Sequence, residues 1–371
     1  MPDRSTTPVH LWIRAEARAT ERRAPVVPAD VRRLREAGIT VTVEDSPQRV
    51  FSVEEYVEAG ATEAEAGSWT DAPDDAFVVG IKELPDGPSE LRHRHVYFAH
   101  AFKGQSDAQA TLERFRRGGG RLYDIEYLTD DNGKRVVAFG YWAGYVGAAL
   151  GVLHLADALH TPLHPMDKPE LDERLHEVGR SGVNRALALV TGARGRSGRG
   201  AQAALAVAGL PVTPWDRKET RDLHKLALLG HDILVNCVVT LVPATPFVED
   251  EDMDHERRLQ VLADVTCDVT GPTNMLPVNT SITTWAEPSR RLHQGTGTLP
   301  PLDVIAIDNL PSLLPREASE GFSADLTTQL LALPELAHSG VHGGTHSAAH
   351  LAGPWHAAAV AFDRAMNRAG S

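Results

Sequence analysis

Two lysines, a histidine and a glutamine gather around two short apolar runs in the first third of this 371-residue chain. Lys82 follows one run, and His100, Lys103 and Gln105 follow the other. Apolar neighbours imply burial, and burial lowers the pKa of a lysine or a histidine because it disfavours the charged form. A lysine shifted in this way approaches the range useful for a general base. The pattern favours a proton-transfer site, although solvated polar residues at a strand end would also produce it.

A glycine-rich turn follows a longer apolar run later in the chain. Gly192, Gly195 and Gly198 come after the run 185–191, which is typical of a strand buried on both faces. Glycines at this spacing allow a tight turn and let the backbone approach a pyrophosphate held at a helix amino terminus. Turn glycines of purely structural origin would have the same spacing.

An acidic residue ends the next expected strand, 211–215. Asp216 stands at about the distance from the glycines where an acid meets the ribose hydroxyls of a dinucleotide. A carboxylate in that place repels a 2′-phosphate and favours NAD over NADP, while the adjacent Arg217 and Lys218 oppose this preference. Together with the glycine turn, Asp216 predicts an NAD site; a solvated, purely structural Asp216 is the alternative.

The elements that must position these residues alternate between strands and helices. The expected strands of a first series are residues 9–13, 39–43, 77–81, 95–98 and 121–127. A second series follows, at residues 185–192, 211–215, 233–239, 261–265 and 304–307. Such alternation predicts an α/β protein with two Rossmann-like domains and parallel-type sheets.

Two helical stretches suggest how the domains are divided. Residues 141–159 predict a long buried helix that connects the domains, and the tail 324–369 is mostly helical and returns to the first domain. We therefore expect a discontinuous substrate and catalytic domain, 1–140 plus 322–371, and an NAD-binding Rossmann domain, 141–321. The active site is expected in the cleft between the domains.

Composition limits the partners of the protein. The net charge of -13 argues against a nucleic-acid partner, whose phosphates require a basic face. A few arginines in a cleft can still bind carboxylates. Neither a signal peptide nor an apolar run long enough to cross a bilayer is evident, so we expect a soluble, cytoplasmic protein without a membrane partner. We expect a monomer or a weak homo-oligomer with small-molecule partners.

The chain contains 2 cysteines. Cys237 and Cys267 both stand in apolar, strand-like runs, which favours buried structural thiols over a redox pair. A histidine-rich stretch runs from His338 to His356, but Gly343 and Gly344 interrupt its helical spacing. We expect no metal site there.

Several motifs resemble the NAD-dependent, lysine-forming saccharopine dehydrogenases, which are relatives of alanine dehydrogenase and the transhydrogenases. The longest is IDNLPSLLPREAS at residues 307–319. The others are residues 11–16, 43–48, 66–69, 80–85, 98–100, 137–140 and 215–220. The resemblance extends over nearly the whole chain and implies an enzyme of lysine biosynthesis.

This resemblance implies a reaction and gives residues to it. A secondary amine that joins lysine and glutarate loses hydride to NAD, and hydrolysis of the resulting imine yields lysine and 2-oxoglutarate. Lys82 would take the proton of the amine, and His100 would activate water and shuttle protons. The implied substrate-binding residues are Arg23, Lys103, Gln105, Arg135 and Phe139. Arginine suits this substrate because it binds carboxylates bidentately.

The resemblance also implies contacts with the cofactor. Besides Gly192 and Gly198 of the turn, the implied cofactor-binding residues are Gly195, Arg196, Asp216, Thr220, Val265, Thr266, Asp268, Ile307, Asp308, Asn309 and Leu310. The sequence departs from the family at Val239, Lys134, Asn309 and Ser197, where tyrosine, arginine, histidine and cysteine are expected. These departures concern the cofactor wall more than Lys82 and His100, and leave a related amino-acid or opine dehydrogenase as the alternative.

Overall fold

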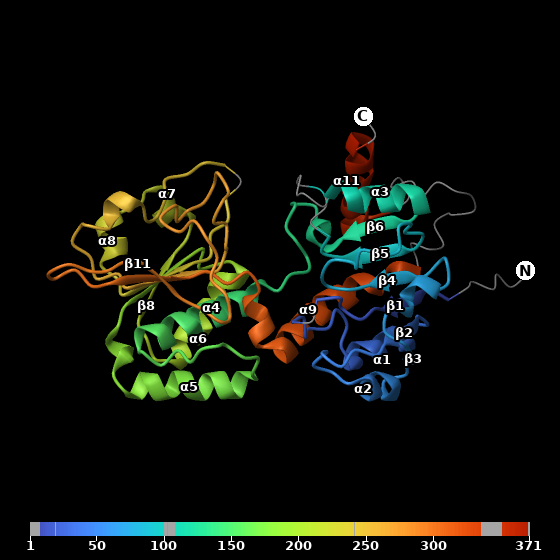
Figure 1. Ribbon diagram of the computed structural model, residues 1–371, viewed down its shortest axis with the longest axis horizontal. Coiled ribbons are helices and arrows are strands. Elements are labelled where there is room, and N and C mark those ends of the chain that lie inside the picture. The colour runs from blue at the N-terminus through green and yellow to red at the C-terminus, as the bar shows by residue number, and fades with distance from the viewer. Residues whose placement is uncertain are drawn as a thin grey trace, which may run out of the picture. The chain divides into compact units, whose positions relative to one another are not determined.

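The computed structural model describes residues 8–18, 20–99, 102, 108–240, 242–334 and 351–369. The chain divides into two compact units: the first unit is Met1–Ala138 with Ala318–Ser371, and the second unit is Phe139–Glu317. Each unit contains a six-stranded sheet (Figure 1). The predicted α/β class with two parallel-type, Rossmann-like sheets is confirmed.

The sheet of the first unit is parallel throughout. Its order is β3-β2-β1-β4-β5-β6, so that β1 and β4 are central neighbours. The strands are β1 (His10–Ile13), β2 (Thr40–Glu44), β3 (Thr62–Ala64), β4 (Phe77–Val79), β5 (Arg94–Tyr97) and β6 (Arg121–Asp124). Because all strands are parallel, their carboxyl ends share one edge of the sheet.

Helices cover this first sheet. They are α1 (Pro28–Glu36), α2 (Val53–Glu58), α3 (Ala108–Gly118), α9 (Pro315–Leu330) and α11 (Gly353–Ala369), with 3-10 turns at Ser68–Asp71 and Ile125–Tyr127. The α11 helix packs on β6 and α3, as Figure 1 shows. The hydroxyl groups of Ser319 and Ser323 on α9 accept the backbone N–H groups of Ala24 and Val27 at 2.8 and 2.9 Å. These bonds join the start of α1 to the late part of the chain.

The sheet of the second unit has the order β11-β12-β10-β9-β7-β8. Its strands are β7 (Ala188–Thr191), β8 (Val212–Trp215), β9 (Ile233–Asn236), β10 (Val261–Asp264), β11 (Arg290–His293) and β12 (Leu302–Ile305). All pairs are parallel except the edge pair of β11 with β12. The predicted second series is thus found, with one antiparallel strand added.

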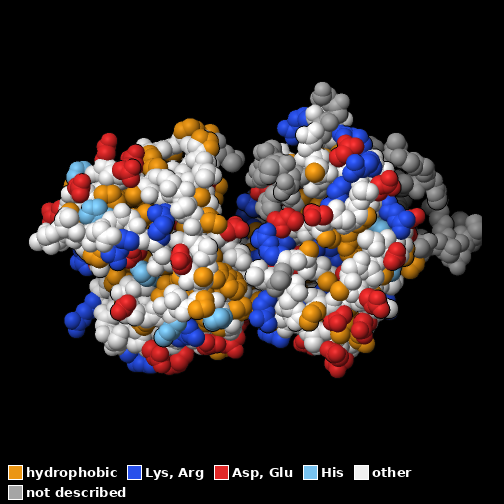
Figure 2. Space-filling model, in the orientation of Figure 1, with side chains coloured by type: hydrophobic (Ala, Val, Ile, Leu, Met, Phe, Trp, Pro, Cys, Tyr) orange, Lys and Arg blue, Asp and Glu red, His pale blue; other side chains and the backbone are white. Residues whose placement is uncertain are grey.

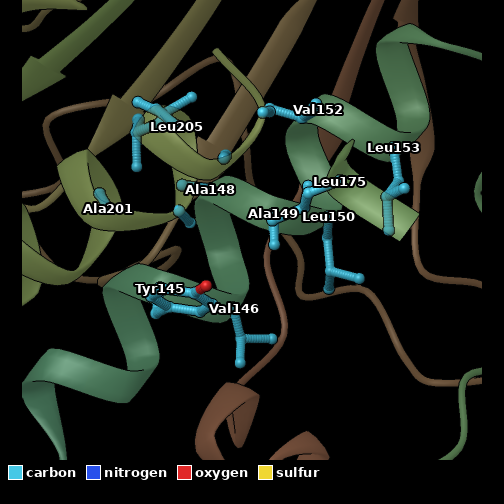
Figure 3. Close-up of a cluster of buried hydrophobic side chains, with 14 of the residues drawn as sticks. Tyr145, Val146, Ala148, Ala149, Leu150, Val152, Leu153, Leu175, Ala201 and Leu205 are labelled. Carbon is cyan, nitrogen blue, oxygen red and sulfur yellow. The ribbon is translucent and has the colours of Figure 1, made fainter. Parts of the chain in front are cut away.

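The second sheet is buried on both faces because alternate residues of each strand point to opposite cores. Val190, Val235 and Ala263 belong to one core, while Leu189 and Leu234 belong to the other. The first of these cores includes α4 (Gly140–Leu155), α5 (Lys168–Arg180) and α6 (Arg196–Val207), whose side chains meet in Figure 3. The short helices of this unit are α7 (Arg217–Arg221) and α8 (Lys225–Leu229), with 3-10 turns at Val183–Arg185, Asp250–Asp252 and Leu310–Leu313.

Glycines let α4 and α6 approach closely. A Cβ atom on Gly144 would overlap the backbone of Ser197, and one on Gly200 would overlap the backbone of Tyr141. The long buried helix that was predicted at 141–159 is present as α4, which ends at Leu155. The small residues of α4 allow the backbone of α6 to approach it closely.

The sequence did not predict α2, α3, β3 or β11. The β3 strand is a short edge strand with exposed residues, and β11 carries Arg290, Arg291 and His293. Neither strand has the apolar run that marks a buried parallel strand. The signal is missing because the residues of these two edge strands are not buried, unlike those of the edge strand β6, which was predicted.

The predictions that were based on composition can be compared with the described structure. On the face that Figure 2 shows, acidic and basic side chains are interspersed over each unit. Among the helices that the structure describes, none is both long and apolar enough to cross a bilayer. The described residues contain no cluster of three metal-ligating side chains, and most of the histidine-rich stretch lies outside them. Cys237 and Cys267 are free and half-buried, so the predicted burial of the two thiols is met in part.

Candidate active site

Lys82 lies at the point where the first sheet reverses its direction of winding. From β1 the chain adds β2 and β3 on one side, and then β4, β5 and β6 on the other. In open α/β sheets, ligands bind in the crevice outside the carboxyl ends of the two strands at such a switch point. Lys82 follows the carboxyl end of β4 closely and is half-buried. Its position agrees with that of a site residue.

Two charged residues of the segment after β1 contact the backbone beside Lys82. Glu16 accepts the N–H of Lys82 at 3.0 Å, and Arg14 donates to the carbonyl of Lys82. Sequence reasoning missed a role for both, although they stand in the motif 11–16. The signal was a charged pair directly after an apolar strand.

Glu21 and Arg23 form a buried ion pair in the same unit. The Arg23 Nε and Nη2 atoms donate to the two Glu21 oxygens at 2.7 and 2.6 Å, and both side chains are at most 4% exposed. Burial alone would raise the pKa of Glu21, but the charge and hydrogen bonds of Arg23 outweigh burial, and Lys82 adds to their effect. The pKa of Glu21 is therefore lowered, and Glu21 is an anion near Lys82. Arg23 is one of the residues that were expected to bind substrate. The Nε and Nη2 edge of its guanidinium is hydrogen-bonded to Glu21.

Glu83 forms an exposed ion pair with Arg18. Their charged atoms are 3.1 Å apart, and the side chains are 48% and 43% exposed. An exposed pair of this kind contributes little to stability. Glu83 is thus a salt-bridged acid in the segment that follows β4.

The segment that leads to His100 runs beside the Lys82 segment. The N–H of Phe98, directly after β5, donates to the carbonyl of Ile81 at 3.1 Å. His100, Lys103 and Gln105 themselves lie outside the described residues. Their proposed roles therefore stay predictions.

Arg135 and Phe139 lie in different units. The Arg135 side chain is 49% exposed, and its Nη1 atom is 3.9 Å from a Glu126 oxygen. Arg135 pairs with Thr129 in an isolated bridge of the segment after β6. Phe139 is the half-buried residue that precedes α4 in the second unit.

A pocket of about 420 Å³ in the first unit is lined by other residues. Trp69, Arg92, His93 and Arg117 line it, and His93 directly precedes β5. The amino ends of parallel strands lie at the edge of the sheet opposite to their carboxyl ends. His93 therefore lies at the edge of the first sheet opposite to the one that Lys82 follows.

The glycine turn of the second unit joins β7 to α6. Gly192 has a φ of +67°, which side chains rarely adopt, and its carbonyl accepts the Gly195 N–H at 2.9 Å. A Cβ atom on Gly198 would overlap the Gly192 carbonyl and come within 2.6 Å of the Cα atom of Ala193. Gly192 and Gly198 are therefore required by the turn itself. Gly195, with φ -70°, is not.

The amino terminus of α6 has the features of an anion site. Gly195 is its N-cap residue, and no side chain of the described residues caps it. The first N–H groups of such a helix lack intrahelical partners and favour a bound anion. Arg196, half-buried, is the first residue of α6. Because the second sheet winds to opposite sides of β7, this turn lies at a switch point.

Asp216 links the end of β8 to the glycine turn. Its carboxylate accepts the backbone N–H groups of Arg194 at 3.1 Å and of Arg217 at 2.8 Å. Its own N–H donates to Glu219, which completes a capping box, and its carbonyl accepts the Thr220 hydroxyl. Asp216 has a structural role at the start of α7. In the same box its carboxylate also accepts the Glu219 N–H, so three backbone N–H groups use its lone pairs and one remains that could accept a ribose hydroxyl.

A buried polar network joins the ends of three strands. Asn236 accepts the Thr191 hydroxyl at 3.1 Å and donates to Asp264 at 3.1 Å, and Thr266 donates to the same Asp264 oxygen at 2.7 Å. Burial raises the pKa of Asp264, although hydrogen bonds from Thr266 and Asn236 oppose this effect. Sequence reasoning missed Asn236 and Asp264. The available signal was a polar residue at the end of each apolar run.

The other expected cofactor residues follow β10 and β12. Val265, Thr266 and Asp268 are half-buried after β10. After β12, Ile307 and Leu310 are buried, Asn309 is half-buried and Asp308 is exposed. These strands are parallel to β7 and β8, so all of the expected cofactor residues lie at one edge of the second sheet.

Comparison with known proteins gives the family. A family model described as the alanine dehydrogenase/PNT N-terminal domain matches residues 12–146. The saccharopine dehydrogenase (NAD+, L-lysine-forming) of Yarrowia lipolytica is 40% identical over 347 residues, covering 89% of this chain and 94% of that enzyme. Its namesake from Neurospora crassa is 41% identical over 349 residues, covering 90% and 94%. The chain belongs to this saccharopine dehydrogenase family.

Solved structures agree with this family at the level of the fold. An L-alanine dehydrogenase aligns with a TM-score of 0.62 at 17% identity, covering 88% of this chain and 90% of that chain. A transhydrogenase from Sinorhizobium meliloti aligns with a TM-score of 0.59 at 15% identity, covering 91% and 98%. The resemblance of the sequence to saccharopine dehydrogenases is thus confirmed.

The residues of this saccharopine dehydrogenase family member fit a dinucleotide. The turn at Gly192 and Gly198 packs too closely for a Cβ atom, and the start of α6, which no described side chain caps, offers N–H groups beside it. Asp216 contacts the same turn through the Arg194 N–H. Backbone N–H groups that could hold phosphates and an acid that could hold a ribose therefore belong to one unit.

Proposed function

We propose that this chain catalyses the NAD-dependent oxidative deamination of saccharopine to L-lysine and 2-oxoglutarate, with Lys82 and His100 as its acid-base groups. The observation that carries the proposal is the identity of about 40% to enzymes of this name over nearly the whole chain. The position of Lys82 at a sheet switch point supports its part in the chemistry.

Lys82 acts in the first half of the reaction. NAD, when bound, supplies the hydride acceptor. Lys82 takes the proton of the secondary amine, and an amine base must be neutral to do so. Because Arg23 balances the charge of Glu21, the region around Lys82 holds a compensated pair rather than a lone buried anion.

His100 acts in the second half of the reaction. It takes a proton from water as the water adds to the imine carbon, and it returns a proton to the departing amine. Amine and 2-oxo acid then separate. This role depends on a residue outside the described part of the chain, so it is supported only by the motif 98–100 and by the neighbouring strand.

Arginine side chains bind the carboxylates of the substrate. Arg135 is half exposed and can present its guanidinium to a ligand in bidentate geometry. Arg23, whose Nε and Nη2 atoms donate to Glu21, stays in the proposed substrate-binding set because the resemblance assigns it there. Lys103, Gln105 and Phe139 complete the proposed substrate set.

The second unit holds the cofactor. The N–H groups at the start of α6 bind the pyrophosphate, and Asp216 accepts the hydroxyls of the adenosine ribose. Arg196 and Thr220 flank these groups. The residues that follow β10 and β12 line the remainder of the cofactor site at the same sheet edge.

The test is an assay of NADH oxidation with lysine plus 2-oxoglutarate, and of NAD reduction with saccharopine. Turnover in both directions is expected, with Lys82→Met and His100→Gln each lowering kcat by about a hundredfold. Alanine and other N-carboxyalkyl amino acids serve as comparison substrates. Faster turnover of one of these than of saccharopine would assign the chain to a different amine or imine.

We also propose a monomer or a weak homo-oligomer, working in the cytoplasm. Light scattering across a range of protein concentrations tests the first statement, and fractionation of the source cells tests the second. An activity that rises with oligomer formation would show that the active form is the oligomer rather than the monomer.

A further inference from the structure

The backbone of Lys82 lies just beyond the hydrogen-bond ladder of β1 with β4. The last bond on that side runs from the Arg14 N–H to the Val79 carbonyl at 3.1 Å. On the β5 side the pairing continues, since the Phe98 N–H donates to the Ile81 carbonyl at 3.1 Å. Because β1 and β4 part at the switch point, the N–H and C=O groups of Lys82 need other partners.

Glu16 and Arg14 provide these partners. The Glu16 carboxylate accepts the N–H groups of Ile81 at 2.7 Å and of Lys82 at 3.0 Å. The Arg14 Nη2 atom donates to the carbonyl of Lys82 and, at 3.5 Å, to that of Glu83. Both polar backbone groups of Lys82 are therefore held by charged side chains, whose hydrogen bonds are stronger than neutral ones.

The pair that holds Lys82 is itself fixed. Its two charged groups are 3.4 Å apart, with side chains only 1% exposed at Arg14 and 5% at Glu16. The Arg14 guanidinium lies 5.7 Å from the centre of the Tyr97 ring. It also lies against Gly80, where a Cβ atom would come within 2.5 Å of the Arg14 Nε atom. The guanidinium therefore has little room to move.

We propose that Arg14 and Glu16 are positioning residues, which hold the backbone of Lys82 so that its amine meets the substrate in one place. A buried ion pair is weak evidence for stability, because well-packed apolar residues often serve as well. Apolar residues could not bond the N–H and the C=O of Lys82, however. This proposal rests on the proposed function, since it takes Lys82 as the proton-transfer group.

The first test compares Glu16→Gln with a matched variant. Glutamine keeps the size of the side chain but sets an amide NH₂ against a backbone N–H. We expect kcat for saccharopine to fall by about tenfold or more, because small misplacements of reacting groups are costly, while the KM for NAD stays within about twofold. The matched variant is Asp232→Asn, which alters a buried carboxylate of the second unit that accepts the N–H of Leu187 at 2.8 Å. Its kcat should stay within about twofold of wild type, since Asp232 contacts neither the Lys82 segment nor the segment after β1.

A double-variant cycle separates positioning from general damage. If Glu16 acts only through the Lys82 amine, Glu16→Gln should change kcat by less than about twofold in the Lys82→Met background. An equal loss in both backgrounds would overturn the positioning role and leave the assignment of Lys82 intact. A Lys82→Met enzyme with wild-type kcat would instead overturn the proposed function. Should Glu16→Gln fail to fold, Arg14→Lys enters the same cycle with the same expected result.

Discussion

Replacing Gly198 by alanine should both destabilise the second unit and weaken the binding of NAD. The added methyl group would overlap the Gly192 carbonyl and lie 2.6 Å from the Cα atom of Ala193. Carbon atoms in contact are ordinarily about 3.5–4.0 Å apart, so the start of α6 has to move by roughly 1 Å. All of these atoms are backbone atoms, which cannot turn aside as a flexible side chain can.

The size of the effect follows from two opposing terms. Overpacking costs about 1–3 kcal/mol, and alanine recovers up to about 1 kcal/mol through its higher helix propensity. The net loss of about 1–2 kcal/mol should lower Tm by about 2–8 °C for a unit of this size. The N–H groups at the start of α6 move with the helix. We therefore expect the Kd for NAD to rise by about tenfold, or 1.4 kcal/mol.

Gly195→Ala is the matched variant. Gly195 has a φ of -70°, and its Cβ atom would meet only the Gly192 carbonyl, at 3.2 Å. Such a replacement stabilises by about 0.4–1 kcal/mol where the backbone conformation is compatible, so Tm should be unchanged or higher. Its Kd for NAD should nevertheless rise, because the backbone approaches the pyrophosphate at this position.

Thermal unfolding and fluorescence titration with NAD measure the two effects separately. A wild-type Tm for Gly198→Ala would refute the contact geometry of the turn. A wild-type Kd for Gly195→Ala would refute the turn as the pyrophosphate site, whatever its effect on stability.

Three further predictions concern buried or paired carboxylates. Asp216→Ala should raise the ratio of kcat/KM for NADP to that for NAD by at least about tenfold, because it removes the charge that repels a 2′-phosphate. Glu21→Gln should lower the free energy of unfolding, as denaturant titration would reveal, because removal of one partner of a buried ion pair typically costs about 3–5 kcal/mol. The pKa of Glu21 is lowered in the folded state, so its contribution is complete above the unfolded value of 4.5 and is lost as the pH falls through the folded value. Burial raises the pKa of Asp264, so its ionisation costs stability as the pH rises from the unfolded value of 3.8. Asp264→Asn should remove this pH dependence and leave the protein more stable at pH 7.

For each of these three predictions, one result of the measurement would contradict it. An unchanged preference between the two cofactors would remove Asp216 from the ribose site. Equal denaturation midpoints for Glu21→Gln and wild type at pH 7 would mean that the pair is solvated. An Asp264→Asn protein less stable than wild type at pH 7 would show that the carboxylate is ionised and fully hydrogen-bonded in the fold.

The strands of both sheets could be predicted because parallel strands buried on both faces require continuous apolar runs. The run 185–191 is one such strand, and its alternate residues do face two cores. Edge strands such as β11 could not be predicted in this way. Its sequence RRLH has a single apolar residue, and it pairs with β12 through backbone groups that any sequence possesses.

The candidate site was predictable where its residues follow strands, as Lys82 and Asp216 do. Arg14 and Glu16 were not, because their role depends on β1 lying beside β4, more than sixty residues later in the chain. No local pattern shows which strands are neighbours. Only the strand order reveals that the segment after β1 must supply hydrogen bonds to the segment after β4.

The glycines show why a motif alone cannot establish a binding site. Gly192 and Gly198 fit the dinucleotide pattern, yet both are required by backbone contacts of the turn. Gly144 and Gly200 lie outside the pattern and are required just as strictly, because α4 approaches α6 there. The spacing of the pattern therefore reports a close packing of strand, turn and helix. The proposed cofactor role rests instead on the start of α6, where no described side chain caps the helix, at a switch point and with Asp216 bound to the same turn.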